Sequence, residues 1–214
     1  MFYPDCKRCP RLAEHLREMA TKHPDYHNAP VPPFGDAAAR LLIVGLAPGA
    51  HGANATGRPF TGDYAGILLY RTLHDAGLAT APESRDVNDG LRLLGCRITN
   101  AVKCLPPANK PTTQEADTCN DFLQAELAGL PPGAVILALG AIAHRAVLRA
   151  LGLRLSDYSF GHDVLHALPN RSHLLDSYHC SRYNTQTKRL TAAMFEAVVA
   201  RAKMLADKAR DDRA

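Results

Sequence analysis

Four short apolar runs, each bounded by turn-forming residues, limit the folds open to this chain more than any other feature. They are typical of buried β-strands and lie at residues 40–46, 96–102, 134–139 and 171–177. Segments with a helical spacing of apolar residues alternate with them, at 64–76, 113–127 and 141–151, and a long final helix is expected from about residue 186. This alternation predicts an α/β protein, with a central four-stranded parallel sheet between two layers of helices.

The length of 214 residues predicts one domain over 1–214. Within it, we expect residues 1–39 to form an N-terminal arm and residues 186–214 a C-terminal helix. No apolar run is long enough to span a membrane, and the first residues do not resemble a secretory signal, so we expect a cytoplasmic protein. The net charge of +4 permits contact with a polyanion without requiring it.

Unusual residues follow the expected strands. In parallel sheets, ligands bind beyond the carboxyl ends of the strands. A segment with five glycines and two prolines, residues 45–63, follows the first strand, and Asn100 ends the second. Residues 140–143 follow the third strand, and the segment DSYHCSRYN at 176–184 follows the fourth. We therefore expect one crevice lined by all four strand exits.

The glycine-rich segment has several interpretations. It lacks the G-x-G-x-x-G of dinucleotide-binding folds, and a phosphate loop would need Lys where Arg58 stands. A long connection with tight turns is the plain structural alternative. Phe60 either faces a pocket or packs in the core. Asp63 precedes a helix, so it is an N-cap, a catalytic carboxylate or both; capping would lower its pKa and weaken it as a base.

The cysteines suggest ligation. Cys6 and Cys9 form a C-x2-C pair, and fourteen residues separate Cys104 from Cys119. Four thiolates can hold zinc or a [4Fe–4S] cluster, and the wide second pair favours iron–sulfur without excluding zinc or four unrelated thiols. Cys180 beside His179 suggests a Cys–His nucleophile, but neighbours in an extended segment point to opposite faces.

Taken together, GLAPG…TGRPFTGD, ITNAVKCLPP, DSYHCSRYN and the cysteine spacing closely resemble the iron–sulfur uracil-DNA glycosylases, in particular the family-5 (b-type) branch. The resemblance runs from Cys6 to about Leu190. It implies the fold of the uracil-DNA glycosylase superfamily, and excision of uracil, hypoxanthine or xanthine from DNA to leave an abasic site. It also implies a structural [4Fe–4S] cluster, held by Cys6, Cys9, Cys104 and Cys119.

The resemblance further implies roles for individual residues. A glycosylase must flip its target nucleotide out of the duplex and read the base by stacking and edge hydrogen bonds. Phe60 would stack on the base, Asn100 would bind its edge, and His179 would donate to O2 of the leaving base. Backbone amides of the glycine loop would contact the nucleotide, and the loop after the histidine would enter the DNA. The backbone amides would be those of Gly45, Ala47 and Gly49. The loop that enters the DNA would carry Arg182, Tyr183 and Asn184.

One departure concerns the reacting water. Many relatives carry a polar residue just after the first glycine of the loop, where this chain has Leu46 and Ala47. Asp63 is then the best candidate for positioning water, so the expected catalytic residues are Asp63, Asn100 and His179. No lysine is placed for a Schiff base, which predicts a monofunctional hydrolase.

Two alternatives of another class remain open. One is a binding module that recognises damaged DNA or a nucleotide without cleaving it. The other is a zinc-stapled small-molecule hydrolase. For the leading hypothesis we expect a monomer that acts on DNA containing uracil or other deaminated bases and lies at the nucleoid.

Overall fold

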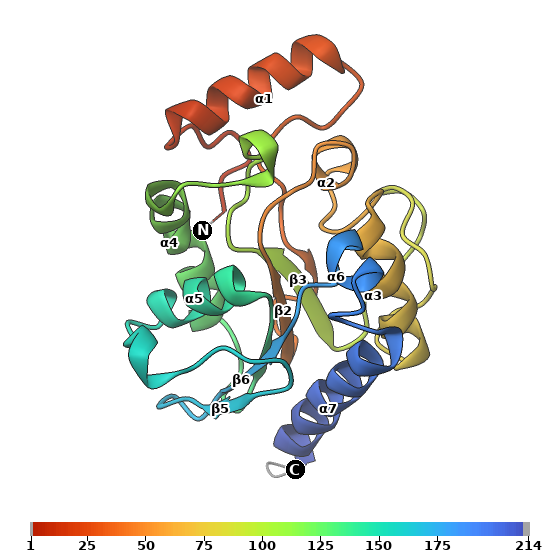
Figure 1. Cartoon of the computed structure of the whole chain (residues 1–214), viewed down its shortest axis with the longest axis vertical. Helices are drawn as coiled ribbons and strands as arrows, with labels where there is room; N and C mark the ends of the chain where they lie inside the picture. The colour runs from red at the N-terminus through yellow and green to blue at the C-terminus, as the bar shows by residue number, and fades with distance from the viewer. Residues whose placement is uncertain (1, 212–214) are drawn as a thin grey trace.

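The protein is built on a six-stranded sheet (Figure 1). The computed structural model describes residues 2–211. In sheet order the strands are β1 (Phe34–Gly35), β3 (Cys96–Asn100), β2 (Leu41–Gly45), β4 (Val135–Leu139), β6 (His173–Ser177) and β5 (Leu165–Ala167). The four inner strands are parallel as predicted, but short antiparallel strands border them on both sides. The predicted count of four strands is therefore wrong for the whole sheet.

The strand register brings the predicted strand exits together. Gly45 at the end of β2 lies opposite Asn100 at the end of β3, and Leu139 of β4 lies opposite Ser177 of β6. Because all four inner strands run the same way, their carboxyl ends form one edge. The glycine-rich segment and residues 176–184 both leave from that edge.

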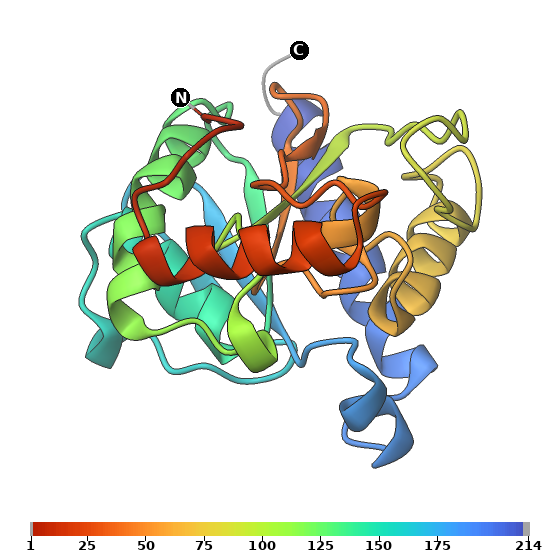
Figure 2. The same cartoon turned by 90° about the horizontal axis from the view of Figure 1, so that it is seen from above.

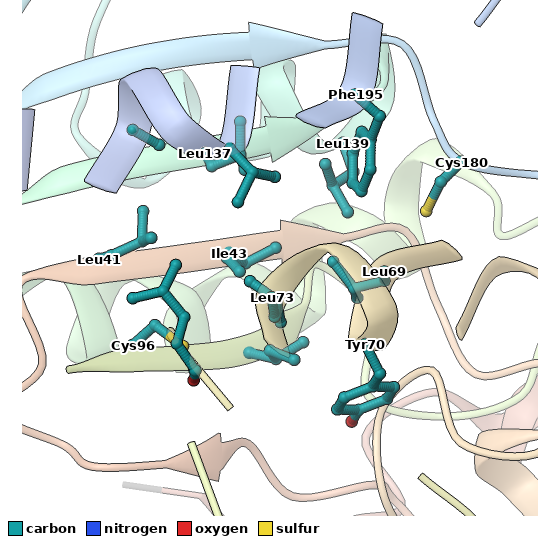
Figure 3. Packing of buried hydrophobic residues seen from close by; sticks show 14 of the residues in the cluster. Leu41, Ile43, Leu69, Tyr70, Leu73, Cys96, Leu137, Leu139, Cys180 and Phe195 are labelled. Carbon is teal, nitrogen blue, oxygen red and sulfur yellow. The ribbon is translucent and has the colours of Figure 1, made fainter. Parts of the chain in front are cut away.

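Helices cover both faces, which confirms the three layers. Side chains alternate between the faces along a strand. Leu41 and Ile43 of β2 therefore pack toward α3 (Tyr64–Asp75) and α7 (Ala192–Asp211), as Figure 3 shows for Leu69, Leu73 and Phe195. Leu42 and Val44 face the other way, toward α4 (Thr113–Ala128) and α5 (Ala141–Ala150). Each face of the sheet thus has its own apolar core.

The N-terminal arm contains a helix that the sequence interpretation did not predict. Helix α1 (Pro10–Lys22) starts with proline, which suits a first helical position because its missing N–H would be unpaired there. Leu12, Leu16 and Met19 are buried against the segment that follows β3 and against α4. Figures 1 and 2 show α1 lying across one end of the molecule. It forms a third, smaller core.

The C-terminal part differs from the expected single helix. A short helix, α6 (Arg182–Gln186), follows the histidine segment and is capped by the Ser181 hydroxyl. The long helix α7 begins only at Ala192. The remaining short elements are α2 (Ala53–Thr56), η1 (Pro107–Asn109) and η2 (Leu155–Asp157). Within residues 2–211, no helix combines the length and the apolar character that a membrane crossing requires.

Candidate active site and cysteine centre

A cavity of about 440 Å³ lies at the carboxyl edge of the sheet. Seven of the expected site residues line it: Ala47, Gly49, Phe60, Asp63, Asn100, His179 and Arg182. Leu46, noted from the sequence as an apolar departure, also lines it, and four further residues were not singled out from the sequence: Tyr64, Ala65, Asn109 and Ser181. Asn109 stood in a proline-rich stretch and gave no signal beyond that of a loop. Three expected residues do not line this cavity: Gly45, Tyr183 and Asn184.

Phe60 lies at the floor of the cavity in a constrained conformation. Its φ of 56° is in the left-handed region, which bulky residues rarely adopt, and only 5 % of the residue is exposed. Tyr70 donates a hydrogen bond of 2.8 Å to the carbonyl of the preceding Pro59. A Cβ on Gly66 would overlap the carbonyl oxygen of Phe60, so glycine is needed there. The surrounding chain therefore fixes the ring in place, as strained residues at functional sites require.

Gly45 has a packing role that differs from the expected contact with substrate. A Cβ at this position would overlap Asn100 Oδ1 and lie 2.6 Å from Phe60 Cζ. The missing side chain lets the aromatic ring and the amide approach each other behind the cavity wall. Gly45 thus acts on the site through its two neighbours.

Asn100 presents an unsatisfied acceptor. The residue ends β3 and is 3 % exposed. Its Oδ1 is buried and has no hydrogen-bond partner among the described residues. A buried amide oxygen without a partner is destabilising, and such groups are concentrated where a ligand binds. The arrangement suits an edge-reading contact with a bound base.

Asp63 is both a helix cap and a cavity residue. Its Oδ1 accepts a 2.9 Å hydrogen bond from the Gly66 amide, which confirms the predicted N-cap of α3. The expected lowering of its pKa is wrong. Burial raises the pKa above the ordinary aspartate value, and the backbone hydrogen bonds from Gly66 and Ala65 offset this only in part. A Cβ on Gly52 would lie 2.7 Å from Asp63 Cβ, so this glycine makes room for the carboxylate.

His179 lines the cavity beside Phe60. The two rings are stacked, with centroids 5.9 Å apart and an interplanar angle of 27°. Protein atoms surround the imidazole, and this desolvation lowers its pKa to about 4, so the ring is neutral near pH 7. Asn184 does not reach the cavity but donates a 2.8 Å hydrogen bond to the His179 carbonyl. It holds the backbone of the histidine in place.

Cys180 points away from His179, as the alternation predicted. It is fully buried in the core between the sheet, α3 and α7, at the edge of the cluster in Figure 3. Burial also raises the pKa of its thiol. A Cys–His nucleophile is therefore excluded for this pair.

The segment after the histidine projects outward from the cavity. Arg182 lines its rim, with its guanidinium 5.8 Å from the centre of the Tyr64 ring. Tyr183 is 71 % exposed. Both residues belong to the short helix α6 and not to a loop as expected. A helix presents these side chains with less loss of conformational freedom on binding than a flexible loop would.

Arg58 does not serve as a phosphate-loop cation. It is buried, its Nη1 contacts both carboxylate oxygens of Asp89 at 2.8 and 3.0 Å, and its guanidinium lies 4.4 Å from the centre of the Phe34 ring. Burial disfavours the charged form of Asp89, but Arg58 and backbone amides outweigh it and lower the pKa to about 2. This ion pair fastens the glycine loop to the segment after α3.

The four predicted cysteine ligands meet under α1. Cys6, Cys9, Cys104 and Cys119 share one small cavity with Leu12 and Phe122. The Lys103 amide donates a 3.3 Å hydrogen bond to Cys119 Sγ. Burial raises the pKa of Cys104 to about 12 and that of Cys119 to about 11, so bare thiols there would stay protonated. A bound cation would favour the thiolates instead, because it stabilises their charge.

Ion pairs from Arg11 on α1 and from Arg8 just before it hold the N-terminal arm over these cysteines. The guanidinium of Arg11 contacts both carboxylate oxygens of Glu115 on α4, at 2.8 and 2.6 Å. Arg8 forms a second pair with Asp121, also on α4, at 2.6 Å. Glu115 completes a capping box with Thr112 at the start of α4. The arm that carries two of the cysteines is thus fixed to the helix that carries a third.

Comparison with known protein families identifies the family. Residues 32–203 match the model of the uracil DNA glycosylase superfamily. The chain belongs to this superfamily. It is 50 % identical to a type-5 uracil-DNA glycosylase of Thermus thermophilus, over 94 % of both chains. A type-5 enzyme of Mycobacterium leprae is 44 % identical, over 94 % of this chain and 91 % of that protein.

The comparison also separates the branches of the superfamily. A type-4 uracil-DNA glycosylase of Pyrobaculum aerophilum is 37 % identical, but over only 60 % of this chain and 58 % of that protein. The two type-5 relatives named above match over more than nine-tenths of their length, so the expected resemblance to the type-5 branch is confirmed. In this member of the superfamily, the cavity is lined by five residues of the glycine-rich segment, Leu46, Ala47, Gly49, Phe60 and Asp63, together with His179.

Proposed function

We propose that the protein is a monofunctional DNA glycosylase that flips uracil out of DNA and hydrolyses its N-glycosidic bond with water. The observation that carries this proposal is the unpartnered Asn100 Oδ1, buried beside Phe60 and His179 in a cavity at the strand exits. The names and nearly full-length match of the type-5 relatives support it. We extend it to one domain over residues 1–214 that acts as a monomer on DNA.

The flipped base would be read by stacking and by its edge. Phe60 offers an aromatic face, and aromatic stacking is how flipped bases are commonly held. The Asn100 amide has one acceptor and two donor positions, so it pairs with the N3–H donor and a carbonyl acceptor of uracil. A rotated amide presents the reverse pattern. This adaptability supports hypoxanthine and xanthine as further substrates.

His179 acts on the leaving base. As the glycosidic bond breaks, negative charge moves onto the base and its O2 oxygen. A neutral imidazole N–H directed at O2 stabilises that charge, and such donors contribute most where charge develops. Because the pKa of His179 is about 4, the donor stays neutral throughout the physiological range. The ring is fixed before substrate binds, which lowers the cost of reorganisation.

Asp63 orients the attacking water. Its carboxylate reaches the cavity while its cap bond to Gly66 holds the side chain. With Leu46 and Ala47 at the usual position of a polar residue, no other carboxylate lines the cavity in the described chain. The reaction therefore depends mainly on departure of the base, with water captured afterwards. The proton of the water passes to the Asp63 carboxylate.

The four cysteines hold a [4Fe–4S] cluster that stabilises the arm and does not take part in the reaction. Tetrahedral zinc with bonds of about 2.3 Å would bring the sulfurs to within about 4 Å of one another. Over the described residues, no three of the four sulfurs lie within 4.8 Å of one another. The wider spacing favours an iron–sulfur cube over zinc. The amide hydrogen bond to Cys119 Sγ is of the kind that supports cluster sulfurs.

The test is release of free uracil from a uracil-containing duplex. We expect His179→Ala to lower the single-turnover rate about 10²- to 10³-fold, as for the loss of one donor to a developing charge. His74→Ala, at an exposed position on α3, is the matched control and should keep the wild-type rate. The assignment fails if the wild type and His179→Ala release uracil equally slowly, or if neither releases any.

A non-catalytic binding module is the second candidate. The apolar Leu46 and Ala47 at the expected position of a water-binding group favour it. Tight binding of uracil-containing DNA with no abasic product would support this alternative.

A further inference from the structure

A buried cluster of two histidines and an aspartate lies apart from the cavity and from the cysteines. His144 comes from α5, His166 from β5 and Asp176 from β6. One ligand-type atom of each lies within 4.8 Å of the other two. Asp176 is fully buried and His144 nearly so, whereas 13 % of the His166 side chain is exposed. Buried charged groups need a partner, which makes the local hydrogen bonding informative.

Both ring nitrogens of His144 are opposed by acceptors. Nε2 lies 3.0 Å from the carbonyl oxygen of Tyr158, which only accepts, so Nε2 carries a hydrogen. Nδ1 lies 2.8 Å from Asp176 Oδ1. With a neutral ring, this contact sets a nitrogen lone pair against a carboxylate oxygen. A positive species, either a proton or a metal ion, must lie between them.

The second carboxylate oxygen of Asp176 also lies close to a histidine nitrogen. Its Oδ2 lies 3.4 Å from His166 Nε2. Both atoms are buried, and neither has a hydrogen-bond partner among residues 2–211. The two imidazoles are the only basic side chains within 4.0 Å of Asp176 in that part of the chain. Lone pairs from three side chains thus converge on one region that carries a formal negative charge.

We propose that His144, His166 and Asp176 bind a divalent transition-metal ion of the zinc class. Two imidazoles and one carboxylate are a usual ligand set for such ions. The bond from His144 Nε2–H to a backbone carbonyl is the outer contact that commonly orients a metal-bound histidine. A water molecule reaching the exposed side of His166 supplies a fourth ligand. The ion ties α5, β5 and β6 together, and β6 leads into His179.

The experiment compares metal retention by matched variants. Purified protein with its cysteine centre loaded is incubated with Zn²⁺, passed through a desalting column, and analysed for zinc and iron per chain. We expect one zinc in the wild type in addition to the iron. His166→Gln and Asp176→Asn should lose more than nine-tenths of that zinc while keeping the iron. His74→Gln, an exposed histidine on α3, should retain both metals.

Cobalt substitution identifies the ligands. Co²⁺ bound by nitrogen and oxygen gives weak visible absorption without the strong near-ultraviolet bands of a cobalt–thiolate site. The difference spectrum of the wild type with and without Co²⁺, in which the absorbance of the cysteine centre cancels, should show these weak bands, and that of His166→Gln should not. If Asp176→Asn does not fold, the partly exposed His166 still provides the test. The proposal is overturned if the wild type keeps no zinc, if His166→Gln keeps as much as the wild type, or if the cobalt spectrum is that of thiolates. In those cases a proton occupies the position between His144 and Asp176.

Discussion

At the scale of single residues, two features of the surroundings of Asp63 have opposite effects on its charge. As a cap it accepts an N–H hydrogen bond, which favours the carboxylate, while burial beside the cavity disfavours it. The effect of burial is the larger of the two, so the pKa of Asp63 is raised. A raised pKa makes a carboxylate a better proton acceptor, so the position that fixes the side chain does not disable it as a base.

This gives a prediction for pH dependence. In the proposed mechanism the carboxylate is the active form, and because its pKa is raised, uracil release should fall on the acid side at a pH above the ~3.9 of an ordinary aspartate. The measurement is kcat/KM against pH on a uracil-containing duplex. Asp63→Asn should lower the rate and remove this acid limb.

Asp36→Asn is the control, since Asp36 also accepts a backbone N–H, from Ala38, away from the cavity. The pH profile of Asp36→Asn should match that of the wild type.

The stability of Asp63→Asn should not fall with its activity. A raised folded pKa means that the ionised Asp63 disfavours folding above that pKa, so Asp63→Asn should unfold no more easily than the wild type at pH 7. Full activity with an unchanged acid limb in Asp63→Asn would contradict the role of Asp63.

A second residue prediction concerns Tyr183. The side chain is largely exposed, so Tyr183→Ala should leave the thermal midpoint unchanged. If the ring fills the stack vacated by the flipped nucleotide, its loss should weaken duplex binding by about 1–3 kcal/mol. The measurement is Kd for a duplex containing an abasic-site analogue, beside Kd for the single strand. An equal effect on both substrates would argue against a wedge.

At the scale of elements, the sequence predicted the inner strands because β2 and β4 are continuous apolar runs, while β3 and β6 carry apolar residues in short segments bounded by turn-forming residues. It missed β1 and β5, which are two and three residues long and exist through pairing with their neighbours. Helix α1 was predictable, since Leu12, Leu16 and Met19 repeat at helical spacing. The break before Ala192 was not, because Leu190 is buried as a helical core residue would be.

The sequence predicted which side chains meet at the site, and their roles in the reaction stay predictions. Phe60, Asn100 and His179 meet in one cavity as expected. Gly45 was assigned to the substrate, whereas it accommodates the side chains of Phe60 and Asn100. Whether a glycine makes room for a ligand or for a neighbour depends on tertiary packing, which local sequence does not encode. The predicted direction of the pKa shift of Asp63 was wrong for the same reason, since burial is a property of the whole fold.

Gly66 provides the prediction for an element. Gly66→Ala would normally favour helix α3 by about 1 kcal/mol, but its Cβ would overlap the carbonyl of Phe60. We expect instead a loss of about 1–3 kcal/mol in the free energy of unfolding and a fall in uracil release, as Phe60 is displaced. Gly129→Ala, at the end of α4, is the control, because its Cβ would meet only ordinary contacts at 3.6 Å and beyond. Denaturant unfolding and single-turnover assays measure the two effects. A stabilised and fully active Gly66→Ala would show that the close packing of Gly66 against the Phe60 carbonyl does not hold Phe60 in its conformation.

At the scale of the whole molecule, the cysteine centre joins segments that are far apart in the sequence. Cys9→Ser should lose iron and visible absorbance and expose residues 10–22 to proteases, because the arm would then depend on a small apolar core and on the contacts of Arg8 and Arg11. Cys96→Ala, a buried cysteine outside the centre, should keep its iron. Metal analysis and limited proteolysis measure both effects. Full iron content in Cys9→Ser would remove Cys9 from the ligand set.

The position of α1 also determines when this helix can fold during translation. Its apolar side chains are covered by Val102, Leu105 and Phe122, which the ribosome makes much later than residues 10–22. Until then α1 has no surface on which to bury Leu12, Leu16 and Met19, and an isolated helix of this length is only marginally stable in water. Residues 10–22 of the nascent chain therefore stay unfolded, with exposed apolar side chains, until the middle of the protein has been synthesised. Delaying elongation before residue 122 should prolong its association with chaperones.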